Sequence, residues 1–302
     1  MQIQTIIKNG LLSATLTLFI LSCTNEQSME IPEPEVISAG YMFTEGPYWH
    51  SDGFLLFSDI PANKVWKWHP EHGAEVFIDS SGNSNGITAD INGDIILAQH
   101  ARKVSRIKSD RSLEVIADNF RGSRFNSPND ITIHSNGTMY FTDPPFGVDE
   151  AERELDFSGV YMLKPGEEPE LFYDGFSHPN GIAFSPDQSK LYVNNSQTGE
   201  IIVFEVDDNG VPANPEHFAN IGEMTRKGGA DGMKTDSHGN LYTTGPNGLI
   251  IFDSQGNQLA QRVFEEQITN LAWGGPDMTW LFLTATSNVY RFKMPVNGEK
   301  RY

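Results

Sequence analysis

The clearest pattern along the chain is a polar start followed by two short hydrophobic runs, and it occurs six times. In each copy the two runs are joined by turn-forming residues such as Asn92-Gly93 or Asn136-Gly137, which is typical of a β-hairpin. Successive copies begin 40, 44, 51, 51 and 39 residues apart, at Glu45, Asn85, Asn129, Asn180, Asp231 and Asn270. This period predicts the blades of a β-propeller.

A third hydrophobic run follows in every copy, and a fourth follows in all but the last. The third runs lie at 65–68, 104–107, 160–163, 201–206, 249–252 and 289–292, and the fourth at 75–78, 113–117, 170–173, 216–219 and 261–264. Residues 35–38 form an extra strand before the first copy. We therefore predict an all-β, six-bladed propeller with four-stranded blades, whose ring is closed by this N-terminal strand joining the last blade. A two-sheet sandwich would not explain six equivalent hairpins.

The first 34 residues differ in composition from the rest. Lys8 is followed by an apolar run at 11–21 and then by Ser22-Cys23, a pattern typical of a lipoprotein signal peptide. We predict that residues 1–22 are removed, that Cys23 is lipidated, and that the polar segment 23–34 is a flexible tether. Residues 35–302 then form one domain. The expected location is the periplasmic or cell-surface face of a bacterial membrane, with membrane contact only through the lipid on Cys23.

Charge and cysteine content narrow the range of partners. The formal net charge is −19, so phosphate backbones would repel the chain and we expect no nucleic-acid partner. Cys23 is the single cysteine, which excludes an internal disulfide and a thiolate metal site. No pattern predicts an oligomeric state.

The residue that begins each copy carries a carbonyl-type oxygen. The first strand of a propeller blade lies innermost, so these six side chains should surround the mouth of the central channel. Two carboxylates and four amides suit Ca²⁺ best, Mg²⁺ or Mn²⁺ less well, and Zn²⁺ poorly. Asn before Gly is also a common turn signal, which is the alternative interpretation. The matched phase of six copies, and Glu45, which no turn rule requires, favour one metal site on the axis.

Several segments resemble a known family, that of regucalcin, the bacterial gluconolactonases and diisopropyl fluorophosphatase, and are most similar to the gluconolactonases. They are TEGP at 44–47, AQHARKV at 98–104, NSPND at 126–130, YFTDPPFG at 140–147, HPNGIAFS at 178–185 and ADGM at 230–233. The resemblance implies that Glu45, Asn129, Asn180 and Asp231 hold the metal. Asn85 and Asn270 would then support these ligands or bind water.

The resemblance also implies a metal-dependent hydrolase that opens a sugar lactone. Ca²⁺ would polarise the carbonyl, and a carboxylate would take the proton of the attacking water. Asp231 is the first candidate for this base, because it is a carboxylate at the metal and the matching family residue is assigned proton transfer. Asp130 is the second, with an ordering role for the Asn129 loop as its alternative.

Substrate binding is assigned to four residues near the predicted channel mouth: Asn129, His100, Asp143 and Phe146. His100 would form a hydrogen bond with a substrate hydroxyl or carbonyl, and Asp143 and Phe146 would form part of the pocket wall. A phosphotriesterase or arylesterase, and a calcium-binding propeller without enzymatic activity, are the competing functions. Hydrolysis assays with and without a chelator distinguish them.

Overall fold

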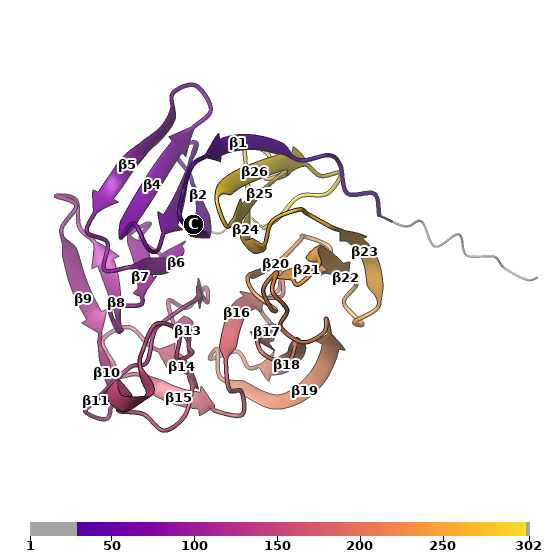
Figure 1. Cartoon of the computed structure of the whole chain (residues 1–302). Coiled ribbons are helices and arrows are strands. Elements are labelled where there is room, and N and C mark those ends of the chain that lie inside the picture. Colours follow the sequence, from indigo (N-terminus) through magenta and orange to yellow (C-terminus); the bar gives the residue numbers. More distant parts are fainter. Residues whose placement is uncertain (1–28, 300–302) are drawn as a thin grey trace, which may run out of the picture.

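The computed structural model describes residues 29–299 and consists of six four-stranded antiparallel sheets arranged in a ring (Figure 1). Blade one contains β2 (Thr44–His50), β3 (Phe54–Asp59), β4 (Lys64–His69) and β5 (Gly73–Asp79). Blade two contains β6 (Ser84–Ala89), β7 (Ile95–Gln99), β8 (Lys103–Ile107) and β9 (Leu113–Ala117), and blade three contains β12 (Ile131–Ile133), β13 (Met139–Asp143), β14 (Gly159–Leu163) and β15 (Glu170–Tyr173).

The second half of the ring repeats this order. Blade four contains β16 (Pro179–Phe184), β17 (Lys190–Asn195), β18 (Glu200–Val206) and β19 (Pro212–Asn220), and blade five contains β20 (Met233–Thr235), β21 (Leu241–Gly245), β22 (Gly248–Phe252) and β23 (Gln258–Arg262). Blade six contains β24 (Ile268–Gly274), β25 (Trp280–Ala285), β26 (Asn288–Lys293) and β1 (Glu35–Ala39). A short hairpin, β10 (Asn119–Phe120) and β11 (Ser123–Arg124), and a 3₁₀ turn at Glu150–Glu152 lie outside the blades.

The predicted propeller and its closure are confirmed. β1 pairs antiparallel with β26, so strands from the two ends of the chain share one sheet and no open edge divides the ring. The first strands of neighbouring blades contact one another around the whole circle, which makes them innermost. The fourth run of blade five, predicted at 261–264, is instead the strand Gln258–Arg262.

The hydrophobic core lies between blades. Every residue of β3 is buried, and its side chains alternate between two neighbours. Leu55 and Phe57 pack with Phe282 of blade six, whereas Phe54 and Leu56 pack against blade two. A strand that is buried on both faces appears in the sequence as a continuous hydrophobic run. This explains why residues 54–57 are all hydrophobic.

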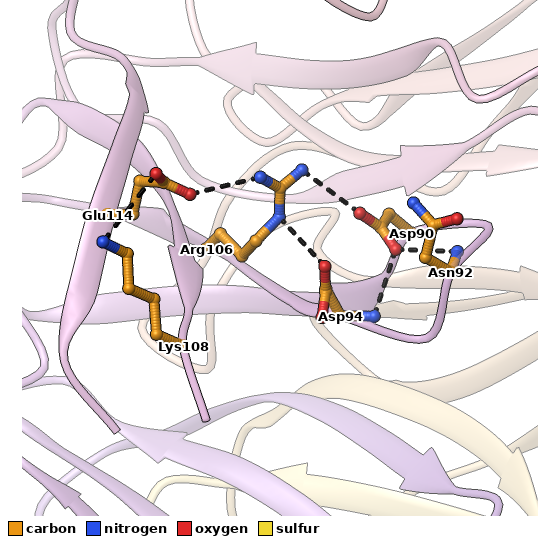
Figure 2. Close-up of polar contacts among 6 residues, drawn as sticks. All are labelled: Asp90, Asn92, Asp94, Arg106, Lys108 and Glu114. Carbon is orange, nitrogen blue, oxygen red and sulfur yellow. Dashed lines mark hydrogen bonds and ion pairs between the residues drawn. The ribbon is translucent and has the colours of Figure 1, made fainter. Parts of the chain in front are cut away.

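Hairpin turns on the outside of the blades are fixed by side chains. In blade two, one carboxylate oxygen of Asp90 accepts the backbone N–H groups of Asn92 and Asp94, at 2.8 and 3.0 Å. Figure 2 shows how Arg106 connects this turn to the neighbouring strands. Its guanidinium lies 3.2 Å from Asp90, 3.4 Å from Asp94 and 3.2 Å from Glu114.

The last residues of the predicted tether contact the propeller. Ile31 is buried, its carbonyl accepts a bond from Arg262 at 3.0 Å, and Glu33 forms an ion pair with the same guanidinium. Residues 29–34 therefore lie against the propeller, because one apolar side chain in this polar segment finds a buried site. The predicted signal peptide and Cys23 lie outside the described residues. Within 29–299, no helix has the length and apolar character needed to cross a membrane.

Candidate metal centre

The six residues that begin the repeats lie at the start of the innermost strands. Glu45, Asn85, Asn180 and Asn270 fall within β2, β6, β16 and β24, whereas Asn129 and Asp231 come two residues before β12 and β20. None is more than 6 % exposed. We call these six residues the axial ring.

Glycines that follow ring residues allow neighbouring blades to approach closely. A Cβ atom on Gly181 would lie 2.1 Å from the carbonyl oxygen of Asp231, and one on Gly232 would lie 2.0 Å from Oδ1 of Asn270. Neither glycine has a positive φ, unlike Gly46 (φ 51°). Close approach of backbones, rather than a tight turn, therefore explains glycine at these two positions.

The backbone of the ring is held by a set of side chains that the sequence analysis missed. They lie at the end of a second strand, and each donates to the carbonyl oxygen of the ring residue in the next blade. The bonds run from Ser58 to Asn85 (2.8 Å), from Thr142 to Asn180 (2.8 Å) and from Asn194 to Asp231 (2.6 Å). The signal is a Ser, Thr or Asn directly after the second hydrophobic run, at matched phase in three copies.

Two ring carboxylates share a desolvated environment. Burial raises the pKa of Glu45 to about 7, although Gly46 N–H and the Asn270 amide donate to it at 2.9 and 3.1 Å. Burial, followed by the negative charge of Glu45, raises the pKa of Asp231 well above its usual range. Both carboxyl groups would therefore be stabilised as anions by a cation placed between them.

A buried amide oxygen at the same place has no donor. Oδ1 of Asn180 has no hydrogen-bond partner among the described residues, while the amide of Asn180 acts on Asp231. An unpaired buried oxygen is costly, and two carboxylates with amide oxygens are the ligands that Ca²⁺ prefers. The residues present thus fit a divalent cation with hard-oxygen coordination.

Asp130 is buried beside the ring, but its oxygens are already used. Oδ1 accepts the N–H of Ile131 at 2.9 Å, and Oδ2 accepts the N–H of Ile182 at 3.3 Å. Burial raises the pKa of this carboxyl, and Lys234 lowers it. Asp130 thereby joins blade three to blade four next to Asn129.

A second group of possible metal ligands lies far from the axis. Within residues 29–299, the one set of three His, Cys, Asp or Glu side chains whose ligand atoms lie within 4.8 Å of one another is His69, Glu71 and His72. They occupy the exposed turn between β4 and β5 on the outside of blade one. This group is separate from the axial ring.

The rim of the ring carries aromatic and imidazole side chains. Nδ2 of Asn85 lies 3.2 Å from Nε2 of His100, and burial lowers the pKa of His100 to about 4. His100 is therefore neutral near pH 7, and its Nε2 is the ring nitrogen that faces the Asn85 amide. The rings of Phe146 and His178 lie 5.5 Å apart, and Gly147 approaches Nδ1 of His100.

Comparison with known proteins identifies the family. The model of the SMP-30/Gluconolactonase/LRE-like region matches residues 43–287. The chain belongs to this family. The gluconolactonase of Zymomonas mobilis is 36% identical over 294 residues, which cover 87% of this chain and 82% of that protein. The resemblance seen in the sequence is thereby confirmed.

Solved structures of family members have the same fold. A gluconolactonase from Xanthomonas campestris superposes with a TM-score of 0.80 at 29% identity, covering 87% of this chain and 89% of its own. A calcium-binding regucalcin from Agrobacterium tumefaciens superposes with a TM-score of 0.74, covering 87% and 94%. Its identity is 19%, so this likeness concerns the fold alone.

Asp143, predicted to bind substrate, is enclosed by the protein. It is fully buried, and its two oxygens accept the N–H groups of Asn126 and Ser127 at 2.8 and 2.7 Å. Burial raises its pKa to about 7 despite these bonds and the charges of Arg102 and Arg153. The geometry makes Asp143 a brace for the loop that leads to Asn129, whereas His100 and Phe146 are only partly buried.

Proposed function

We propose that this protein hydrolyses a sugar lactone with the help of one divalent cation held by Glu45, Asn129, Asn180 and Asp231. The observation that carries the proposal is the pair of desolvated carboxylates beside the unpaired amide oxygen of Asn180. Membership in a family that includes a gluconolactonase supports the reaction. Calcium is the proposed ion because every ligand is a hard oxygen.

When bound, such a cation supplies polarisation of the lactone carbonyl and stabilises the charge of the tetrahedral intermediate. Asp231 takes a proton from the attacking water as the water oxygen bonds to the carbonyl carbon. The bond between that carbon and the ring oxygen then breaks, and Asp231 returns the proton to the departing oxygen. The product is the open-chain hydroxy acid.

The remaining residues position this chemistry. Asp130 and Asp143 hold the backbone on either side of Asn129, and each carboxylate accepts two backbone N–H bonds that stabilise it as an anion. Bonds that stabilise the anion make a carboxylate a weaker base, which favours Asp231 over Asp130. Neutral His100 has Nε2 engaged by Asn85, and its Nδ1 can form a hydrogen bond with a substrate hydroxyl, which either donates or accepts.

The test is hydrolysis of an aldonolactone, a phosphotriester and an aryl ester by metal-free protein, before and after addition of Ca²⁺. We expect the lactone to be cleaved fastest, with activity lost on chelation and restored by Ca²⁺. The melting temperature should fall on chelation, because a ligand that binds only the folded state stabilises it. Full activity and an unchanged melt in the presence of chelator would remove the metal from the proposal.

A further inference from the structure

A cavity of about 120 Å³ continues the axis beyond the ring. Most of its lining comes from the same innermost strands, two to four residues after each ring position, and Met278 and Glu299 complete it. The side chains that are partly exposed to this space include Tyr48, Thr88, Thr132 and Lys234. Beyond the carboxylates and amides of the ring, the channel is therefore lined by aromatic, hydroxyl and lysine side chains.

Lys234 is the one positively charged side chain in this lining. Its ammonium donates to the carbonyl oxygen of Met233 at 2.9 Å. No carboxylate of residues 29–299 lies within 4.0 Å of it, so it forms no ion pair there. Lysine usually extends its ammonium into solvent. The position of this half-buried lysine in the lining of the cavity therefore requires a reason.

The charge of the axial region supplies that reason. Glu45, Asp130 and Asp231 are 2 %, 2 % and 6 % exposed, and such buried charge is unfavourable unless it is compensated. The proposed divalent cation compensates two of the three negative charges. Lys234 follows Asp231 by three residues and lines the cavity beside Ile131, the neighbour of Asp130. The ammonium and the proposed cation together would balance the three axial carboxylates, while Glu299, which also lines the cavity, is partly exposed.

We propose that Lys234 is a positioning residue that neutralises the third axial carboxylate and so limits the channel to one divalent cation of moderate affinity. This inference rests on the proposed metal site. The ammonium repels the cation and weakens its binding. The ammonium also offsets the charge of the third carboxylate, which would otherwise weaken the polarisation of the substrate carbonyl by the cation. Loss of the ammonium should therefore tighten Ca²⁺ binding and slow turnover.

Three substitutions separate charge from packing. Lys234→Arg keeps the charge, Lys234→Gln keeps a donor for the Met233 carbonyl without the charge, and Lys234→Met keeps neither. The metal-free proteins are titrated with Ca²⁺ by calorimetry at pH 8, which reports affinity and stoichiometry independently of activity. We expect the Gln and Met variants to bind Ca²⁺ at least about tenfold more tightly than wild type, and the Arg variant to match wild type.

Other results would overturn the inference. Equal affinities for wild type and the Met variant would show that the ammonium does not act on the site. If the Gln variant instead matches wild type and only the Met variant differs, Lys234 acts through its hydrogen bond rather than its charge. If wild-type protein binds no Ca²⁺, the proposed metal site fails and this inference fails with it. Binding without lactone hydrolysis would refute the proposed reaction alone, and the affinity comparison would still test Lys234.

Discussion

Asp231→Asn is the substitution that most directly tests the proposed mechanism. It keeps an oxygen that can bind the cation and removes a charge and the capacity to accept a proton. The backbone N–H and carbonyl of Asp231 are bonded to Thr244 and Asn194 at 3.2 and 2.6 Å, and these bonds do not involve its side chain. The side chain of Asp231 lies in a buried pair with the carboxyl group of Glu45, so removing one of the two charges should leave the metal-free protein at least as stable as wild type.

The effect on catalysis should be much larger. Loss of a general base lowers kcat by about 10² to 10⁴, which corresponds to about 3 to 5 kcal/mol of activation free energy. The assay measures lactone hydrolysis over a range of Ca²⁺ concentrations, with site occupancy followed by calorimetry. If Asp231 is the base, kcat stays low when the site is full, because added Ca²⁺ restores a ligand but not a proton acceptor.

Two further variants serve as controls. Glu45→Gln removes one charge from the same ring, and its remaining oxygen can still accept from Gly46 and Asn270, so saturating Ca²⁺ should restore most of its rate. Asp130→Asn can keep only one of its two acceptor oxygens. It should therefore lose about 1 to 3 kcal/mol of stability while retaining most of its kcat. Equal rescue of the Asp231 and Glu45 variants by Ca²⁺ would rule out Asp231 as the base.

Three other predictions concern regions around the site. His100 has a folded-state pKa of about 4, below its unfolded value, so its contribution to stability is complete above about pH 6.5 and is lost as the pH falls towards 4. Urea unfolding of His100→Gln should lack this loss, and identical pH profiles of stability for the variant and wild type would contradict the prediction. Arg106→Gln breaks the contacts with Asp90, Asp94 and Glu114 and should cost about 1 to 2 kcal/mol at low salt, with activity unchanged; an unchanged denaturation midpoint would show that the network contributes nothing. Cys23→Ser should release the protein from the membrane fraction of a bacterial host, whereas a soluble wild-type protein would exclude the lipid anchor.

The blade pattern could be predicted because each hairpin is specified locally. Strand alternation and turn residues recur at one period, and a single edge strand at 35–38 was left to close the ring, as β1 does. The last strand of blade five was misplaced by a few residues. Its sequence, Gln-Leu-Ala-Gln-Arg, places only two apolar residues between polar ones on an outer strand, so the hydrophobic pattern does not mark its start.

The candidate site was only partly predictable, because its ligands recur in sequence but its supports act between blades. The phase of the repeats identified the ring. The bonds from Thr142 to Asn180 and from Asn194 to Asp231 span 38 and 37 residues, and no local rule pairs such positions. Asp143 was assigned to the substrate for the same reason, since its two backbone donors lie 16 and 17 residues earlier in the chain.

Discrimination between substrates must arise at the rim rather than in the ring. The ring residues are buried, and their backbone is held by neighbouring blades, so a cation that they hold would polarise the carbonyl or phosphoryl group of any substrate in the same way. The rim offers the paired rings of Phe146 and His178 and the neutral imidazole of His100. Aromatic faces suit the C–H surface of a sugar, and a neutral imidazole nitrogen suits one of its hydroxyls. A phosphotriester without hydroxyl groups would leave that nitrogen without this bond, which costs binding energy and agrees with the sugar lactone proposed above.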